Sequence, residues 1–370
     1  MKTALILGGT GAMGVYLVDE LINQGEYDIY VTSRSERTSF HNNLHYIKGN
    51  ARDEEFIKSV LTKRWNVIVD FMNYGYDEFK ERHPLLLDNT DHYVFLSSAR
   101  VYSYSDFPIK ENHPRLLDVS DDKEFLSTQR YALRKARQED MLKESGRVNY
   151  TIIRPYITYS PERLQLGIYE KEQWLYRILH KKPVVIRKEI LNKKTSLSSG
   201  KDVSFVISRI MGNKSAFGEA YHIATEETMK WKDILELYID IIKNRTGIVP
   251  MIYLSDNMPL LENCFEGGYN TKYDRLYDRC FDNSKSHIFS EDMKYISMKD
   301  GLSDALNNFL EGERKFLSIQ QDFEAFSDRM IGIDFSEIIE ENLKKEYLEY
   351  LKNPLYSETE NYSYTLYEGE

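Results

Sequence analysis

The sequence predicts an α/β fold in which a doubly wound parallel sheet comes first, a smaller mixed α/β part follows, and a helical extension ends the chain. Two observations carry this prediction. Short apolar segments alternate with helical segments through the first 155 residues, and a glycine-rich turn directly follows the first apolar segment. A regular strand–helix alternation favours a parallel sheet with helices on both faces.

The first half of the chain contains six predicted strands and three predicted helices. Each strand is a short, mostly apolar run, as in strands buried on both faces, and each helix carries apolar residues at helical spacing. Gly25 stops the first helix, and Pro155 closes the last strand. The predicted strands are Thr3–Leu7, Tyr27–Thr32, His45–Lys48, Val67–Asp70, Tyr93–Leu96 and Tyr150–Arg154. The predicted helices are Met13–Asn23, Glu54–Leu61 and Arg130–Glu144.

The pattern loosens after residue 155. A further strand is expected at Pro183–Ile186, with helices at Trp231–Lys243, Met298–Leu310 and Phe335–Leu351, and the tail from Asn353 is polar and acidic. Three parts are expected: residues 1–155 as the parallel-sheet domain, which the chain re-enters later, residues 156–312 as a mainly substrate-binding region, and residues 313–370 as a helical, acidic extension.

Composition narrows the class of protein. The chain has 370 residues, 41% of them hydrophobic, which is enough for one large domain or two modest ones. A net charge of −10 disfavours nucleic acid and anionic membranes as partners, although it does not exclude small anionic ligands. The first apolar segment, ending at Leu7, is too short for a signal-peptide core, and no segment reaches the roughly 18 apolar residues of a membrane span. We expect a cytoplasmic protein that binds neither nucleic acid nor membrane.

The two cysteines, Cys264 and Cys280, are too few for a disulfide framework, and no histidine near them suggests a zinc site. We therefore expect free thiols, no bound metal and a reducing compartment.

The glycine-rich turn has the spacing of a phosphate-binding loop, since Gly8, Gly11 and Gly14 lie three residues apart between the first strand and helix. The first glycine permits a tight turn, the second lets a pyrophosphate approach the backbone, and the third lets helix and strand pack closely. The N–H groups of the helix N-terminus attract the phosphates. This turn predicts a Rossmann domain that binds NAD or NADP. The residues between the glycines that are expected to contact the cofactor are Thr10, Ala12 and Met13.

The residues after the second strand favour NADP over NAD. An acidic side chain there would accept a hydrogen bond from the 2′-hydroxyl of NAD, but this chain has Ser33 and Arg34. Arg34 suits a 2′-phosphate, Ser33 can hydrogen-bond the same group, and Arg37 is a second candidate. The alternative is that Arg34 is a solvated charge or stacks on the adenine of either cofactor.

Tyr131 and Lys135 lie four residues apart on a predicted helix and therefore share one face. A nearby ammonium stabilises a phenolate, which suits the tyrosine for acid/base catalysis, and the lysine can also hold a nicotinamide ribose. The strand Tyr93–Leu96 ends in Ser97 and Ser98, where ligands of open α/β sheets bind. A serine there can hydrogen-bond a substrate oxygen, or it can be ordinary turn chemistry.

Together, four segments resemble the extended short-chain dehydrogenase/reductase family, and within it the NAD-dependent epimerase/dehydratase branch, which acts mainly on nucleotide sugars. They are Gly8–Gly14, Ser97–Tyr102, Tyr131–Lys135, and Ile153–Pro155 with Tyr159–Pro161. The resemblance covers about residues 1–312. It implies Tyr131 as acid/base, Lys135 as its partner and Ser98 as the hydroxyl that polarises the substrate. It also implies a nucleotide-sugar substrate and a homodimer formed through helices that include the one bearing Tyr131.

The resemblance also extends the expected cofactor site. Gly49–Asp53 is similar to a family loop near the adenine, although Asn50 stands where an aspartate is usual, and Phe71–Asn73 follows a strand that lines the family's cofactor pocket. The additional residues expected to contact NAD(P) are Asn50, Ala51, Met72, Asn73, Ser97, Tyr131, Lys135 and Pro155.

One departure from the family bears on the reaction. Dehydratases of this branch carry an Asp–Glu pair where this chain has Ala99 and Arg100. Without that pair we expect epimerisation or carbonyl reduction by hydride transfer, with Tyr131 as acid/base. The alternative is a non-catalytic protein that uses NAD(P) binding as a sensor or scaffold. The expected substrate contacts are Arg100, Arg154, Tyr159, Arg163, Lys194 and Thr195.

Overall fold

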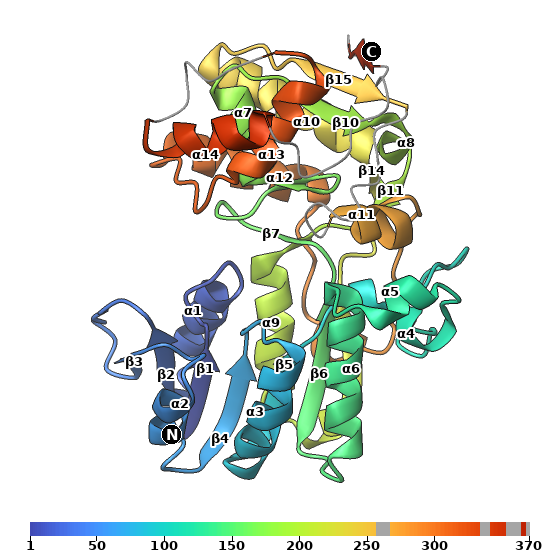
Figure 1. The fold of residues 1–370 in the computed structure, drawn as a ribbon. Helices are drawn as coiled ribbons and strands as arrows, with labels where there is room; N and C mark the ends of the chain where they lie inside the picture. The colour runs from blue at the N-terminus through green and yellow to red at the C-terminus, as the bar shows by residue number, and fades with distance from the viewer. Residues whose placement is uncertain (257–266, 334–340, 353–363, 368–370) are drawn as a thin grey trace. The chain divides into compact units, whose positions relative to one another are not determined.

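The computed structural model describes residues 1–256, 267–333, 341–352 and 364–367 (Figure 1). The chain divides into two compact units. Unit 1 comprises Met1–Ser160, Ser196–Glu227 and Cys280–Ile296, and unit 2 comprises Pro161–Thr195, Thr228–Arg279 and Ser297–Glu370. The chain therefore leaves unit 1 and returns to it twice.

Unit 1 is built on a seven-stranded parallel sheet with the order β13-β6-β5-β4-β1-β2-β3. The strands are β1 (Lys2–Leu7), β2 (Tyr27–Ser33), β3 (Leu44–Lys48), β4 (Trp65–Asp70), β5 (Thr90–Leu96), β6 (Tyr150–Pro155) and β13 (Glu219–Ile223). Strand order reverses between β1 and β4, where ligands of doubly wound sheets bind beyond the carboxyl ends. The predicted fold class is confirmed.

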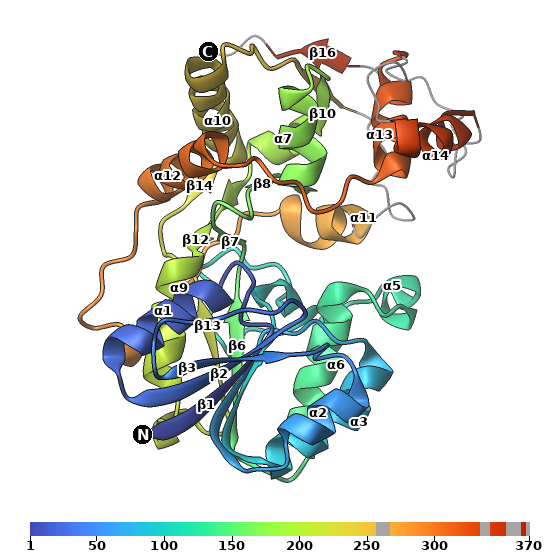
Figure 2. The ribbon, with the colours of Figure 1, turned by 90° about the vertical axis from the view of Figure 1, so that its left-hand side faces the viewer.

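Helices cover both faces of this sheet (Figure 2). Side chains of a strand alternate between the two faces, so Ala4 and Ile6 pack with α1 and α9, whereas Leu5 and Leu7 pack with α2, α3 and α6. The helices are α1 (Gly14–Gln24), α2 (Glu54–Val60), α3 (Tyr76–Asp88), α4 (Leu116–Val119), α5 (Lys123–Ser127), α6 (Tyr131–Glu144) and α9 (Gly200–Ile210). A short pair, β7 (Thr158–Tyr159) and β12 (Ser198–Ser199), leads into α9.

The strands and helices predicted for the first half of the chain are all present. Unit 1 also contains elements that were not predicted: the helices α3, α4, α5 and α9 and the strands β7, β12 and β13. α3 contains Pro84, and proline normally interrupts a helix because it lacks an N–H donor. β13 lies more than sixty residues after β6 in the sequence, and the two strands pair in the sheet. Such a long-range pairing has no local sequence signal.

Unit 2 combines a three-stranded sheet of order β10-β15-β16 with helices. The sheet strands are β10 (Val184–Arg187), β15 (Ile252–Ser255) and β16 (Tyr364–Leu366). The helices are α7 (Lys171–Leu179), α8 (Lys188–Leu191), α10 (Trp231–Thr246), α11 (Gly267–Asn270), α12 (Met298–Glu311), α13 (Gln321–Met330) and α14 (Glu341–Lys352). Two short pairs join β8 (Gln165–Leu166) to β9 (Tyr169–Glu170) and β11 (Lys194–Thr195) to β14 (Met229–Lys230).

Three of the elements predicted for the second half are confirmed: β10, α10 and α12. Of the predicted helix 335–351, the part from Glu341 is present as α14, and residues 335–340 lie outside the described residues. The predicted tail from Asn353 lies mostly outside them as well, except for β16 and Tyr367.

Buried ion pairs attach the C-terminal extension to the rest of unit 2. Arg177 of α7 pairs with Glu324 at 3.0 Å and with Asp328 at 2.5 Å, and Lys182 pairs with both carboxylates. The hydroxyl of Tyr347 on α14 donates to Asp328 at 2.9 Å. Because an unpaired buried charge is costly, these pairs favour one register of α13 on α7.

Within the described ranges, no helix is long and apolar enough to cross a membrane. In the same ranges, no group of His, Cys, Asp or Glu side chains is arranged to hold a metal ion. Cys280 forms no disulfide, and Cys264 lies outside the described residues.

Acid should destabilise unit 1 through His92. The imidazole accepts a hydrogen bond from Gly212 N at Nδ1 (2.9 Å), so Nε2 carries the proton and donates to Thr151 Oγ1 at 2.8 Å. Burial lowers the pKa of His92 to about 4, so the folded state holds it neutral. Its contribution, up to roughly 3 kcal/mol, is present above pH 6.5 and is lost as pH falls towards 4.

The His92→Gln variant should therefore show a shallower loss of unfolding free energy between pH 6.5 and 4, measured by urea denaturation. His287→Gln is the control, because His287 is exposed, and it should follow the parent protein. The same pH dependence in both variants would contradict the assignment to His92.

Candidate cofactor and active site

The glycine turn lies between β1 and α1. Gly8 has a φ of +71°, which favours glycine, and its N–H donates to Thr32 Oγ1 of β2 at 3.1 Å. α1 begins at Gly14 with no side-chain cap and no acidic residue in its first turn. No carboxylate of its first turn therefore neutralises the positive end of the helix, which can attract an anion.

A side chain would have a different effect at each glycine of the turn. A Cβ on Gly14 would lie 2.5 Å from the backbone of Gly9, so only glycine lets α1 pack on the turn. A Cβ on Gly9, which was not among the predicted residues, would lie 2.7 Å from Ile6. A Cβ on Gly11 would meet nothing closer than 3.7 Å. Packing does not require glycine at position 11, whose backbone instead lines a cavity.

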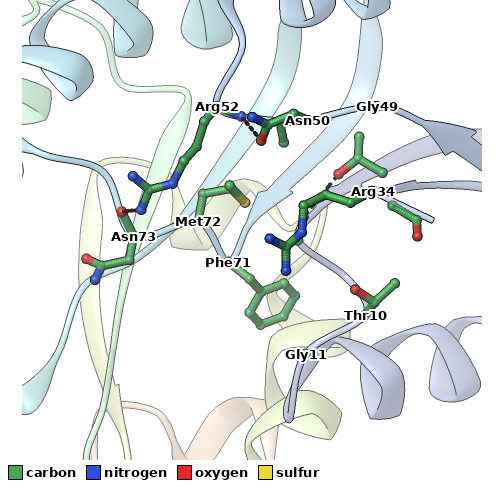
Figure 3. Close-up of a pocket in the computed structure, with 13 residues that line it drawn as sticks. Thr10, Gly11, Arg34, Gly49, Asn50, Arg52, Phe71, Met72 and Asn73 are labelled. Carbon is green, nitrogen blue, oxygen red and sulfur yellow. Dashed lines mark hydrogen bonds between the residues drawn. The ribbon is translucent and has the colours of Figure 1, made fainter. Parts of the chain in front are cut away.

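This cavity of about 350 Å³ lies at the carboxyl ends of β1, β2 and β4 (Figure 3). The expected cofactor residues that line it are Gly8, Thr10, Gly11, Ser33, Arg34, Asn50, Ala51, Met72 and Asn73. Four further residues line it: Thr32, and also Gly49, Arg52 and Phe71, which lie in segments expected near the cofactor but were not singled out as contacts. Each of these is adjacent in sequence to a predicted contact, so counting the whole of both segments would have included Gly49, Arg52 and Phe71.

The charge of the cavity suits an anionic ligand. Its thirteen lining residues include two arginines and no carboxylate. Arg34 is exposed at the end of β2, and Arg52 Nη2 donates to the carbonyl of Asn73 at 2.5 Å. Ser33, expected to bind a phosphate, is buried, and its hydroxyl donates to the carbonyl of Ser35 at 2.8 Å. Arg52 also pairs with Glu78 at 3.7 Å, so Arg34 is the lining cation that best suits a phosphate of a dinucleotide.

Two expected catalytic residues lie near the carboxyl end of β5. Lys135 of α6 is buried, and its Nζ donates to the carbonyl of Leu96 at 2.6 Å. Ser98 begins the 3₁₀ turn Ala99–Val101, where its Oγ accepts from Arg100 N at 3.2 Å.

Tyr131, the first residue of α6, is half-buried, and its ring lies beside two guanidinium groups. Arg100 lies 5.0 Å and Arg134 5.8 Å from the ring centroid. A cation at this distance over an aromatic face is attracted to it. Arg100, in the turn that Ser98 begins, therefore connects this turn to the ring of Tyr131.

These residues are distinct from the cavity lining. The expected cofactor residues that do not line the cavity are Ala12, Met13, Gly14, Ser97, Tyr131, Lys135 and Pro155. Gly14 and Ser97 have internal partners instead: Gly14 packs on Gly9, and the hydroxyl of Ser97 donates to the buried carboxylate of Glu139 at 2.6 Å.

Burial alters the charge states around Lys135. Desolvation lowers the pKa of Lys135 to about 8, while the carboxylates of Asp70 and Glu139 act in the opposite direction. Burial also raises the pKa of Asp70, at the end of β4, to about 6, although the hydroxyl of Tyr93 donates to it at 2.8 Å. A lysine with this pKa is largely an ammonium at pH 7 and begins to lose its charge just above it.

In unit 1, two expected substrate-binding residues lie in the core. Arg154, only 3% exposed, pairs with Glu139 at 2.6 Å and donates to the hydroxyl of Tyr102 at 2.9 Å. A guanidinium with these partners faces the core, which differs from the expected contact with substrate. Tyr159 is also buried, in β7.

In unit 2, the remaining expected substrate-binding residues have different surroundings. Arg163 is partly exposed and pairs with Glu170 at 3.0 Å. Lys194 has an exposed side chain, while its backbone N–H donates to Asp278 at 2.8 Å. Thr195 is buried, and its hydroxyl has no hydrogen-bond partner among the described residues.

Two comparisons of sequence bear on this site. Residues 8–174 match a protein family described as NAD(P)H-binding. A curated relative, the chloroplast stem-loop binding protein of 41 kDa b from Arabidopsis thaliana, is 28% identical over 243 residues. The match covers 61% of this chain and 59% of the relative, so it spans less than two thirds of that protein.

Solved structures share the fold over most of the chain. The enzyme WbmH of Bordetella bronchiseptica, in complex with NAD⁺, matches with a TM-score of 0.63 and 16% identity, over 84% of this chain and 99% of its own. The UDP-glucose 4-epimerase of Bifidobacterium longum, in complex with NAD⁺ and UDP, matches with a TM-score of 0.62 and 17% identity, over 85% of this chain and 100% of its own. The dTDP-glucose 4,6-dehydratase of Bacillus anthracis, in complex with NAD, matches with a TM-score of 0.63 and 17% identity, over 85% of this chain and 99% of its own.

Residues 8–174 thus match an NAD(P)H-binding family, and the glycine-lined cavity lies in an α/β fold that this chain shares with solved NAD complexes. More particularly, the solved structures that share this fold include an epimerase and a dehydratase, each in complex with NAD.

Gly11→Ala should weaken NAD(P) binding at least about tenfold, because the new methyl group would occupy the cavity where phosphates approach the backbone. Its unfolding free energy should stay close to that of the parent, since no atom lies within 3.7 Å of the added Cβ. Isothermal titration calorimetry and urea denaturation measure the two quantities.

Gly14→Ala is the matched comparison. Its Cβ would overlap the backbone of Gly9, so this variant should lose roughly 1–3 kcal/mol of stability. Equal loss of stability in both variants, with unchanged cofactor affinity for Gly11→Ala, would argue against a phosphate site at Gly11.

Proposed function

We propose that this protein is an NAD(P)-dependent nucleotide-sugar epimerase or reductase in which Tyr131 is the acid/base. The observation that carries the proposal is the attachment of the helix bearing Tyr131 and Lys135 to the carboxyl end of β5, in the same unit as the glycine-lined cavity. Support for a nucleotide sugar comes from the Bifidobacterium epimerase, whose structure contains UDP.

The residues of the cavity fit a dinucleotide. Gly8, Thr10 and Gly11 would hold the pyrophosphate at the start of α1, and Arg34 would face the adenosine end. The bare backbone at Gly11 and the absence of carboxylates from the lining support this assignment. A bound NAD(P) supplies the hydride acceptor and donor for the reaction.

The chain's own residues would move and hold protons. The phenol oxygen of Tyr131 would exchange a proton with a sugar hydroxyl or carbonyl oxygen, and Ser98 would donate a hydrogen bond to the same oxygen. Lys135 would provide an ammonium beside the phenol. Ala99 and Arg100 replace an acidic pair that elimination of water needs, which favours epimerisation or reduction over dehydration.

The proposal extends to the rest of the molecule. Residues 156–312 would contact the substrate, with Arg163, Lys194 and Thr195 as candidates in unit 2, while residues 313–370 would form the helical, acidic extension. The family resemblance supports a homodimer formed through helices that include α6. The small number of cysteines supports a cytoplasmic location.

A second candidate function is a non-catalytic NAD(P)-binding protein. The observation in its favour is the plant relative, which is named as a stem-loop binding protein. Cofactor binding without turnover of any UDP- or dTDP-sugar would support this candidate. Binding of an RNA hairpin would then distinguish a nucleic-acid partner from a sensor or scaffold role.

We further propose that the cofactor is NADP, because Arg34 is an exposed cation at the end of β2. Arg34→Ala should weaken NADPH binding roughly tenfold or more, since it removes a charge-assisted bond to the 2′-phosphate. NADH binding should change less than about twofold. Lys80→Ala is the control, because Lys80 is an exposed cation of α3 that does not line the cavity. An equal effect of Arg34→Ala on both cofactors would contradict 2′-phosphate recognition.

Tyr131→Phe should lower kcat by roughly 10²–10⁴-fold, because the phenol oxygen that carries the proton is lost while the aromatic ring remains. NAD(P) affinity should be nearly unchanged. Turnover is measured over a panel of UDP- and dTDP-sugars by NMR, and cofactor affinity by fluorescence. Full turnover by this variant would exclude Tyr131 as the acid/base.

A further inference from the structure

Glu139 is a buried carboxylate on the catalytic face of α6. Positions 131, 135 and 139 are four residues apart, so Tyr131, Lys135 and Glu139 lie along one side of the helix. The side chain of Glu139 is completely buried. An ionised group is costly in the core unless other groups bind it, so its partners indicate what it does.

The partners of Glu139 come from the ends of two neighbouring strands. The hydroxyl of Ser97, which follows β5, donates to Oε1 at 2.6 Å. Arg154 of β6 binds both oxygens, through Nε at 2.8 Å and Nη2 at 2.6 Å. Arg115 adds a weaker contact at 3.4 Å. Burial alone would raise the pKa of Glu139, but Arg154 and Ser97 hold it below its usual value, so the group is a carboxylate at neutral pH.

Lys135 and Glu139 together form a two-point attachment between α6 and β5. Lys135 Nζ donates to the carbonyl of Leu96, and the next residue, Ser97, donates to Glu139. Two successive turns of α6 therefore bind two successive residues of the strand end. Ser98, the proposed substrate-polarising residue, comes next along the chain.

We propose that Glu139 is a positioning residue, which holds Lys135 and Ser98 in place by binding Ser97 and Arg154 at the ends of β5 and β6. This inference rests on the function proposed above. The competing interpretation is that Glu139 and Arg154 form an ordinary core ion pair that contributes to stability alone.

The two interpretations differ in what happens to Lys135. Burial lowers the pKa of Lys135. The carboxylates of Asp70 and Glu139 raise this pKa, and the neighbouring Arg134 lowers it further. If Glu139 serves Lys135, removing its charge must lower the pKa of Lys135 further, whatever happens to the ion pair.

The experiment measures the pKa of Lys135 by NMR titration of the full-length protein with labelled lysine, in three variants. Glu139→Gln removes the carboxylate and leaves Arg154 unpaired. The double variant Glu139→Gln with Arg154→Met removes both charges, a replacement that is often neutral for stability. Asp140→Asn is the matched control, because Asp140 is the next residue of α6 and also pairs with Arg115, at 2.8 Å.

We expect the pKa of Lys135 to fall by about half a unit or more in both Glu139 variants and to be unchanged in Asp140→Asn. Turnover should fall in the Glu139 variants, with its alkaline limit moved to lower pH. If Glu139→Gln does not fold, the double variant decides. An unmoved pKa of Lys135 would overturn the proposal, and so would a double variant that fails to fold, because either result assigns Glu139 to stability alone.

The titration does not depend on catalysis. If the parent protein turns over no nucleotide sugar, the proposed reaction fails, while a shift in the pKa of Lys135 still establishes that Glu139 acts on it. The converse outcome is that the parent protein is active and Tyr131→Phe is inactive, but the pKa of Lys135 is unchanged in the Glu139 variants. In that case the proposed function is retained without this role for Glu139.

Discussion

The attachment of α6 to the carboxyl end of β5 is the constraint on which the rest of unit 1 depends. It uses a buried ammonium and a buried carboxylate, Lys135 and Glu139, and each must be satisfied because desolvated charges are costly. Arg154 carries the network from Glu139 to the hydroxyl of Tyr102, which in turn lies 3.3 Å from His222 of β13. One chain of polar contacts thus joins α6 to three adjacent strands of the sheet.

The cofactor cavity illustrates how local charge differs from net charge. The chain as a whole carries −10, yet the cavity has two arginines, Arg34 and Arg52, and no carboxylate in its lining. Close to a ligand, the nearest charges dominate the potential, because screening weakens distant ones. The uncapped start of α1 acts in the same direction, so the region around Gly11 is favourable for an anion despite an acidic protein around it.

Much of the fold and part of the site could be predicted from sequence. The turn at Gly8–Gly14, the strands of the first half and the pair Tyr131–Lys135 lie where periodicity and spacing indicate. The predictions for Ser97 and Arg154 as ligand contacts were less informative, since both side chains bind Glu139 in the core. A polar residue at a strand end can face either a ligand or a neighbouring helix, and local sequence does not distinguish the two.

The sequence by itself determined where the backbone must come close to another group, because glycine is the one residue that permits such an approach. Gly14 and its contact with Gly9 are an example, and the strand–turn–helix follows from it. Only the tertiary structure decided which charges are buried together and which line the cavity. Glu139, Arg154 and Ser97 meet through the packing of α6 against β5 and β6, and the direction of each side chain is set by that packing rather than by residue type.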